Sequence, residues 1–218
     1  MLLLIALGCR KVVDVETPKP DDLAPLETPN LAPDVPADGD EENPEAISFA
    51  SGQQDDGVTW WGHAKANIAE PISVVWACFQ DPDAVVDRRE VDEWTTEIGT
   101  EPDFDFSVLV HNTVHDIITV DFDVLWLHEL QVGTPDAPEE VEVNWQKNDG
   151  ASVIQLLVGS AVLTPVDDGA TTHLEIEENL QATQRDQETI TSYEGDLWAS
   201  VAACAHGDPL PEYSDPEQ

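Results

Sequence analysis

The sequence predicts an α+β domain that consists of one strand, two short helices, six antiparallel strands and a long C-terminal helix. Apolar and polar residues alternate from about residue 93 to residue 180, as they do in half-buried strands. A helical apolar stripe occupies residues 186–206, and a shorter helical pattern follows Pro71. These observations together predict about seven strands and one dominant helix.

The first strand is expected at residues 58–68, VTWWGHAKANI, because this stretch is rich in aromatic and β-branched residues. A short helix follows, since apolar residues recur at helical spacing from Ile72 to Phe79 and Pro71 suits the first helical position. The helix is expected to end at Asp81, before a proline, and a second helical turn to cover residues 83–88.

After the short helices the apolar pattern changes to a period of two, which predicts strands, and near the C-terminus it becomes helical again. The six further strands are expected at residues 93–98, 106–115, 120–128, 141–146, 152–166 and 172–180. The short links between them favour antiparallel pairing. The final helix is expected from Asp186, with Thr183 as an approximate capping box partner, to His206, and Gly207 ends it.

This order of elements resembles the START-like, helix-grip superfamily (SRPBCC), which includes polyketide cyclase/dehydrase and lipid-transport proteins and the birch pollen allergen. Three stretches carry the resemblance: PISVVWACFQDPDAV, GSAVLTPVDDGATTHLEIEENLQA and VAACAHGDPLP. The resemblance covers nearly all of residues 58–210 and implies a sheet curled around the long helix, with a cavity between them. Members use that cavity for apolar small molecules, and the superfamily has no invariant catalytic motif.

Three polar residues interrupt the apolar face that would line such a cavity. Asn112, His128 and Glu178 fall in register with apolar neighbours, and a few placed polar groups in an apolar pocket are typical of ligand sites. The remaining expected lining residues are Val110, Phe122, Trp126, Trp145, Ile176, Tyr193 and Leu197. The alternative is that the polar residues lie near strand ends and that the tryptophans are simply core.

Metal and cofactor sites are not expected. His111 and His115 have helical spacing but lie on a predicted strand, which would place them about 13 Å apart. No glycine-rich phosphate loop and no nucleophile beside a base appears in the sequence. General acid–base work by His128 or Glu178 stays open, so an enzyme is a weaker alternative and no catalytic residue is assigned.

Charge excludes several classes of partner. The formal net charge is −38, from 46 acidic and 8 basic side chains. Nucleic acid and anionic membrane surfaces would be repelled, because no basic stripe offers a binding footprint. The oligomeric state is left open by the sequence.

The N-terminus resembles a bacterial lipoprotein signal. Six apolar residues precede Gly8 and Cys9, too few to span a bilayer, and Cys9 would carry the lipid and anchor the chain to the membrane. Residues 1–9 are therefore expected to be a signal peptide, residues 10–56 a disordered, acidic, proline-rich tether, residues 57–207 the START-like domain and residues 208–218 a disordered acidic tail. The expected location is the bacterial cell envelope, and Arg10 favours the outer membrane.

Export would place Cys78 and Cys204 in an oxidising compartment, where an even pair of cysteines favours a disulfide. The resemblance implies that the two short helices lie beside the end of the long helix, which would bring the two cysteines together. Two free buried thiols are the alternative.

Three functions fit these observations. The first is an envelope lipoprotein that binds an apolar small molecule, such as a lipid or a polyketide, in an internal cavity. The second is a non-catalytic interaction or structural module with a filled core, which would show no cavity and an exposed apolar patch. The third is a cyclase or dehydratase, which needs a His or carboxylate in the cavity with a hydrogen-bonded partner.

Overall fold

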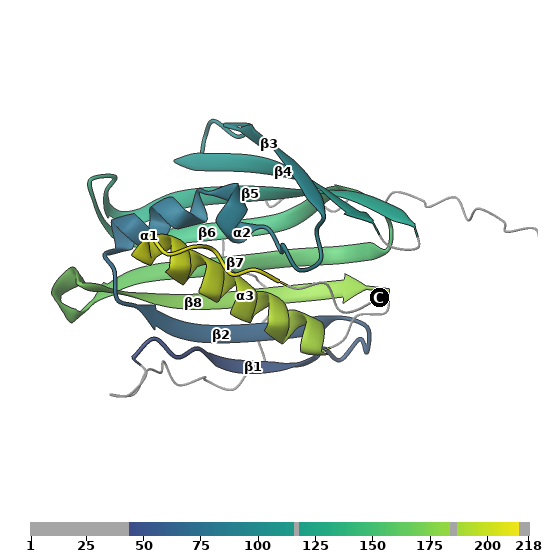
Figure 1. Ribbon diagram of the computed structural model, residues 1–218, viewed down its shortest axis with the longest axis horizontal. Coiled ribbons are helices and arrows are strands. Elements are labelled where there is room, and N and C mark those ends of the chain that lie inside the picture. Colours follow the sequence, from purple (N-terminus) through teal and green to yellow (C-terminus); the bar gives the residue numbers. More distant parts are fainter. Residues whose placement is uncertain (1–43, 116–117, 184–186, 214–218) are drawn as a thin grey trace, which may run out of the picture.

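The computed structural model describes residues 44–115, 118–183 and 187–213, and it confirms the predicted α+β architecture (Figure 1). The predicted signal peptide with Cys9, and most of the predicted tether, lie outside these residues. One antiparallel sheet contains eight strands in the order β1-β2-β8-β7-β6-β5-β4-β3. The strands are β1 Ser48–Gln53, β2 Trp60–Ile68, β3 Glu93–Ile98, β4 Phe106–His115, β5 Thr119–Thr134, β6 Ala137–Gly150, β7 Ile154–Val166 and β8 Thr171–Ala182.

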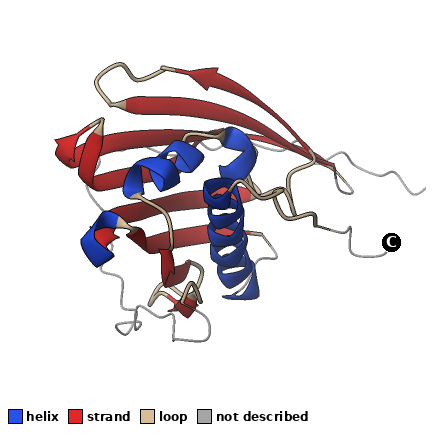
Figure 2. Ribbon diagram, turned by 60° about the vertical axis from the view of Figure 1, so that its left-hand side comes forward, coloured by secondary structure: helices blue, strands red, loops and turns tan. Residues whose placement is uncertain are grey.

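All three α-helices lie on one face of this sheet (Figure 2). They are α1 Ile72–Phe79, α2 Pro82–Val85 and the long α3 Gln187–His206, while a 3₁₀ turn, η1, covers Asp167–Gly169 between β7 and β8. Figure 1 shows α3 running obliquely across the strands, with α1 and α2 beside one of its ends. Among the described residues, no helix combines the length and apolar character that crossing a bilayer requires.

The meander follows the predicted period of two. Strands β3 to β8 pair with their neighbours in sequence, and β8 then pairs with β2, from Ile68↔Thr172 to Trp60↔Leu180. Register shifts interrupt the β5–β6 pairing after Asp123 and Leu130. Such irregularities bend strands, so they help these two long strands curve toward the helices.

Strand β1 corrects the predicted domain boundary. Ser48–Gln53 lies within the predicted tether of residues 10–56, yet it pairs residue by residue with β2, from Ser48↔Lys65 to Gln53↔Trp60. The stretch contains no proline and no acidic residue, unlike its surroundings. Pairing with a sheet edge uses backbone groups, so it needs no apolar period. The sheet therefore has eight strands rather than about seven, and the domain begins before residue 57.

The predicted tail is also partly folded. After Gly207 the chain turns back along α3 (Figure 1), and the described residues 208–213 end with Tyr213, whose ring lies 5.7 Å from the guanidinium carbon of Arg88. A cation over an aromatic face is a favourable contact. The prediction of a disordered tail from residue 208 is therefore wrong for these first residues.

Helix α3 packs closely against strand β2 at Gly62. A side chain at Gly62 would clash with Ile190 and Glu194, both on the buried face of α3. Glycine removes that obstacle, so the helix can pack directly on the backbone of β2.

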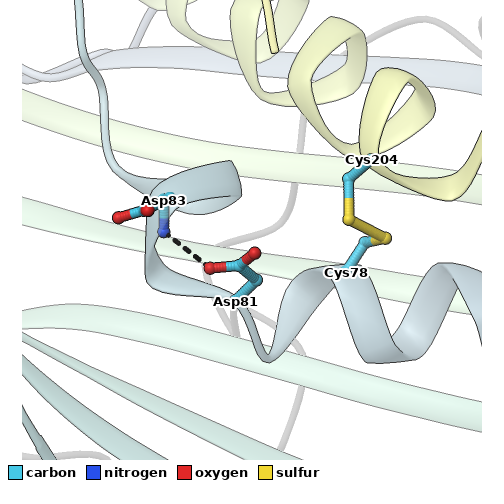
Figure 3. The surroundings of a disulfide bond; sticks show 4 residues. All are labelled: Cys78, Asp81, Asp83 and Cys204. Carbon is cyan, nitrogen blue, oxygen red and sulfur yellow. Dashed lines mark hydrogen bonds between the residues drawn. A yellow bond between two sulfur atoms is a disulfide. The ribbon is translucent and has the colours of Figure 1, made fainter. Parts of the chain in front are cut away.

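The opposite end of α3 is joined to α1 by a disulfide between Cys78 and Cys204, whose Cα atoms are 5.8 Å apart (Figure 3). Helix α1 is held against the sheet as well, since it buries Ile72, Val75 and Phe79. The long helix is thus fixed at both ends: to β2 near its start and to α1 near its end.

We expect Cys204→Ser to lower the free energy of unfolding by about 4–5 kcal/mol, because the bridge closes a loop with a sequence separation of 126 residues. Urea unfolding with and without dithiothreitol measures the effect. The reductant should destabilise the wild-type chain to the level of the variant and leave the variant unchanged. Finding both the Cys78 and the Cys204 thiol free in denatured, unreduced protein would contradict the bridge.

Candidate functional site

A cavity of about 490 Å³ lies between the helices and the concave face of the sheet, partly open to solvent. This volume is within the range of small-molecule sites. Apolar and aromatic side chains dominate its wall, with Asp87, Glu90, Asn112, Glu178 and three threonine or tyrosine hydroxyls as the polar groups. The lining residues are Val85, Val86, Asp87, Glu90, Val91, Val110, Asn112, Val114, Ile118, Val120, Phe122, Val124, Trp126, Trp145, Val153, Ile154, Leu157, Glu178, Leu180, Ala182, Thr183, Thr189 and Tyr193.

Seven of the ten predicted lining residues lie on this wall: Val110, Asn112, Phe122, Trp126, Trp145, Glu178 and Tyr193. The other three do not. Ile176 on β8 and Leu197 on α3 belong to the packed core, although Glu178 and Tyr193, nearby on the same elements, reach the cavity. Near the start of α3, therefore, Thr189 and Tyr193 face the cavity while Ile190 and Glu194 pack on β2, and farther along the helix Leu197 lies in packed core.

His128 is the third exception, and it has a structural role. It is fully buried on β5, where its Nδ1 accepts a hydrogen bond of 3.2 Å from Nε1 of Trp76 on α1. Its ring also packs edge-on against Phe106, with the centroids 4.9 Å apart. Burial lowers the pKa of His128 to about 3, so the ring is neutral at physiological pH. The predicted cavity role of His128 is wrong.

The sequence analysis missed the part of the wall that follows α2. Val85 ends α2, and Val86, Asp87, Glu90 and Val91 come from the link between α2 and β3; together they close one side of the cavity. The helical turn expected over residues 83–88 does not show which of its side chains face a cavity, so only the run of valines could have suggested burial.

Glu178 is flanked by a glycine on each of the two neighbouring strands. In register it stands between Gly62 on β2 and Gly159 on β7. A side chain at Gly159 would clash with the ring of Trp145, so the glycine lets this indole lie over β7 beside Glu178. The Trp145 ring in turn stacks on Trp126, with the centroids 4.7 Å apart. The carboxyl therefore stands beside a wall of aromatic rings.

The Glu178 side chain is 2% exposed, and its Oε2 has no hydrogen-bond partner among the described residues. Burial raises the pKa of Glu178 well above its usual range; the Trp145 indole N–H, which faces it without full hydrogen-bond geometry, opposes this rise, and the charge of Asp87 adds to it. Burial therefore favours the neutral form of this carboxyl in the absence of a ligand.

Two α3 residues extend this buried polar region. Glu194 is fully buried, and neither of its carboxyl oxygens has a hydrogen-bond partner in the described chain. Burial raises its pKa well above the usual range, and the nearby Glu178 raises it further. Burial also raises the pKa of the Tyr193 hydroxyl, with Glu178, Asp87 and Glu194 as further causes.

Asn112 and Asp87 complete the polar wall. The Asn112 amide nitrogen donates to the carbonyl oxygens of Val110, at 3.1 Å, and Phe122, at 3.4 Å, which leaves its side-chain oxygen to accept a hydrogen bond from a ligand. Burial raises the pKa of Asp87, and the charge of Arg89 partly offsets that rise. The guanidinium nitrogens of Arg89 lie 3.6 Å from Asp87 Oδ2 and 3.5 Å from Asp196 Oδ2, so this cation is already engaged.

One group of possible metal ligands lies on the outer face of the sheet, away from the cavity. His63, Glu175 and Glu177 place their ligand atoms within 4.8 Å of one another. Glu175 Oε1 already receives His63 Nε2 at 2.6 Å and Lys65 Nζ at 3.2 Å. These contacts, the His63 hydrogen bond first, lower the pKa of Glu175 to about 2. The lysine occupies a position that a cation would need.

Neither a protein-family model nor a curated protein matches the chain, whereas solved structures do match its fold. The lipid transfer and protein localization domain of human StarD13 is similar with a TM-score of 0.52 and 13% identity, covering 75% of this chain and 84% of that domain. Human StAR-related lipid transfer protein 5 is similar with a TM-score of 0.51 and 11% identity, covering 80% of this chain and 84% of that protein. The chain has the helix-grip fold. At such identities the likeness shows the fold alone.

We expect His128 to make the protein acid-sensitive. Its folded pKa of about 3 lies below the ordinary 6.5, so its stabilising contribution is complete above pH 6.5 and is lost as the pH falls toward 3. Complete protonation of His128 would lower the free energy of unfolding by on the order of 5 kcal/mol. Chemical denaturation from pH 7 to pH 4 should show a shallower fall for His128→Gln than for wild type. His115→Gln, at an exposed position, serves as the control, and equal slopes for His128→Gln and wild type would refute the assignment.

Proposed function

We propose that this protein binds an apolar small molecule, such as a lipid or a polyketide-like compound, in the cavity of its helix-grip domain. The cavity itself carries the proposal: about 490 Å³ with a mainly apolar and aromatic wall and few polar groups. Such a composition gives affinity through apolar burial and orientation through the polar groups. The printed descriptions of the two human structures name lipid transfer, which is consistent with this class of ligand.

The two alternatives have less support. A filled interaction module predicts no cavity, and the exposed large apolar side chains of the described residues are scattered over several elements. A cyclase or dehydratase needs a His or carboxylate in the cavity with a hydrogen-bonded partner. His128 lies outside the cavity, and Oε2 of Glu178 has no hydrogen-bond partner among the described residues. Asp87 does have a partner, but this is Arg89, whose guanidinium stays protonated and cannot relay a proton.

We also propose that the domain is held at a bacterial membrane through a lipid on Cys9. The apolar run that ends in Gly8-Cys9 supports the anchor, and the acidic, proline-rich chain that follows would serve as the tether. The Cys78–Cys204 disulfide is consistent with an exported protein. The net charge of −38 would keep the domain away from an anionic lipid surface while the anchor keeps it nearby.

A larger side chain inside the cavity should weaken ligand binding. Leu157 on β7 lines the cavity, whereas its neighbour Val158 points to the outer face of the same strand. In the full chain, Leu157→Trp should weaken binding of the hydrocarbon probe diphenylhexatriene at least tenfold, and Val158→Trp should leave it unchanged. Probe fluorescence measures both. No binding to the wild type, or equal binding by the two variants, would count against the proposed function.

Lipidation should depend on Cys9 alone. The full chain, expressed in a bacterium behind an added basic segment that completes the signal, should incorporate labelled palmitate and partition into detergent. Cys9→Ser should do neither, because the thiol is the acylation site. A wild-type chain that forms the Cys78–Cys204 disulfide, and has therefore been exported, yet remains unlabelled would exclude the anchor.

A further inference from the structure

The cavity contains one carboxyl group without a partner. Glu178 lines the cavity, is 2% exposed and has an oxygen that no described residue binds. An unpartnered buried polar group costs about 1–3 kcal/mol, more when it is charged. A ligand group that meets this carboxyl would recover that free energy.

The other charges of the wall decide which ligand group fits. Its three carboxyl residues are Asp87, Glu90 and Glu178, and none of the lining residues in the described chain is basic. Arg89, the cation behind the wall, is shared by Asp87, Glu90 and Asp196. In the wall itself a ligand carboxylate would therefore meet acidic groups, whereas a positive group would meet Glu178. The nearby cations lie outside the wall: Arg89 is ion-paired with the acidic residues named above, and the buried Lys147, which pairs with Val124, donates to the Gly150 carbonyl oxygen.

The aromatic residues beside Glu178 favour the same charge. The Trp145 indole lies over β7 next to Glu178. The Tyr193 ring meets this indole edge-on, and the centroids of the two rings are 6.5 Å apart. The Trp145 indole N–H faces Glu178 and favours its ionised form, the form that attracts a positive group, while the rings offer apolar surface to the body of a ligand. The carboxyl and the rings are thus complementary to one positive group attached to an apolar body.

We propose that the ligand of this cavity is an amine-bearing apolar molecule whose protonated nitrogen pairs with Glu178 against the Trp145 and Tyr193 rings. This inference rests on the proposed function and narrows it, from apolar molecules in general to cationic amphiphiles. Because burial favours the neutral form of Glu178 in the free protein, pairing with an ammonium group favours loss of the carboxyl proton to solvent.

The test is displacement of diphenylhexatriene from the full chain by decylamine, decanol and decanoic acid, which share one chain length. Decylamine should displace the probe at a concentration at least tenfold lower than decanol, and decanoic acid should be the weakest. Measuring at about 0.15 M and 1 M salt separates attraction to the acidic surface, which salt screens, from pairing inside the cavity.

Two variants locate the effect. In Glu178→Gln the advantage of decylamine over decanol should disappear while the probe still binds. Glu177→Gln is the matched control, since it removes an acidic side chain from the outer face of the same strand and should retain the advantage. An advantage that persists in Glu178→Gln, or is equally lost in Glu177→Gln, would overturn the assignment to Glu178.

A second measurement on the wild type needs no variant. Calorimetric titration of decylamine near pH 7, in two buffers of different ionisation enthalpy, should report a net release of protons on binding. No proton release, or equal displacement by decylamine and decanol, would refute the amine while leaving the proposed function intact. Failure of the wild type to bind the probe at all would instead count against the proposed function.

Discussion

The contact between α3 and β2 at Gly62 is the constraint on which the rest of the structure depends. Because Gly62 has no side chain, helix α3 lies with its Ile190 and Glu194 side chains directly on the β2 backbone at this point. At its other end the disulfide to Cys78 holds it beside α1. A straight helix fixed in this way cannot follow a curved sheet along its whole length. Packed core fills the interface near Leu197, and the cavity opens near Tyr193.

The buried carboxyls are costly features of this architecture. A protein with 46 acidic side chains can expose nearly all of them, yet Glu178 and Glu194 face the interior, and none of the described residues bonds to the oxygens of Glu194 or to Oε2 of Glu178. Their pKa values are raised because burial disfavours the charged form. An apolar residue at either position would pack without that cost, so stability alone does not account for them. A ligand pairing with Glu178 would account for one of the two.

The errors of the sequence analysis have a common physical cause. Strand β1 was missed because its short, weakly apolar sequence gains its order from backbone pairing with β2. The early tail was missed because the Tyr213 ring contacts Arg88, which is distant in sequence. His128 was assigned to the cavity because it shares a face with Trp126, but it lies under α1, where Trp76 donates to it. Each assignment depended on a neighbour that local patterns do not reveal.

The sequence by itself determined the order of the elements from β2 onward and the inward positions of the meander, because period, capping residues and residue type are local properties. It therefore placed Asn112, Trp145 and Glu178 on the inner face correctly. It left the Cys78–Cys204 bridge as one of two alternatives, which the tertiary structure decided by bringing the two sulfur atoms together. Only the tertiary structure decided which inward residues face a cavity and which lie in packed core. That distinction depends on the distance between α3 and the sheet, which small residues such as Gly62 and Gly159 set through contacts between segments far apart in sequence.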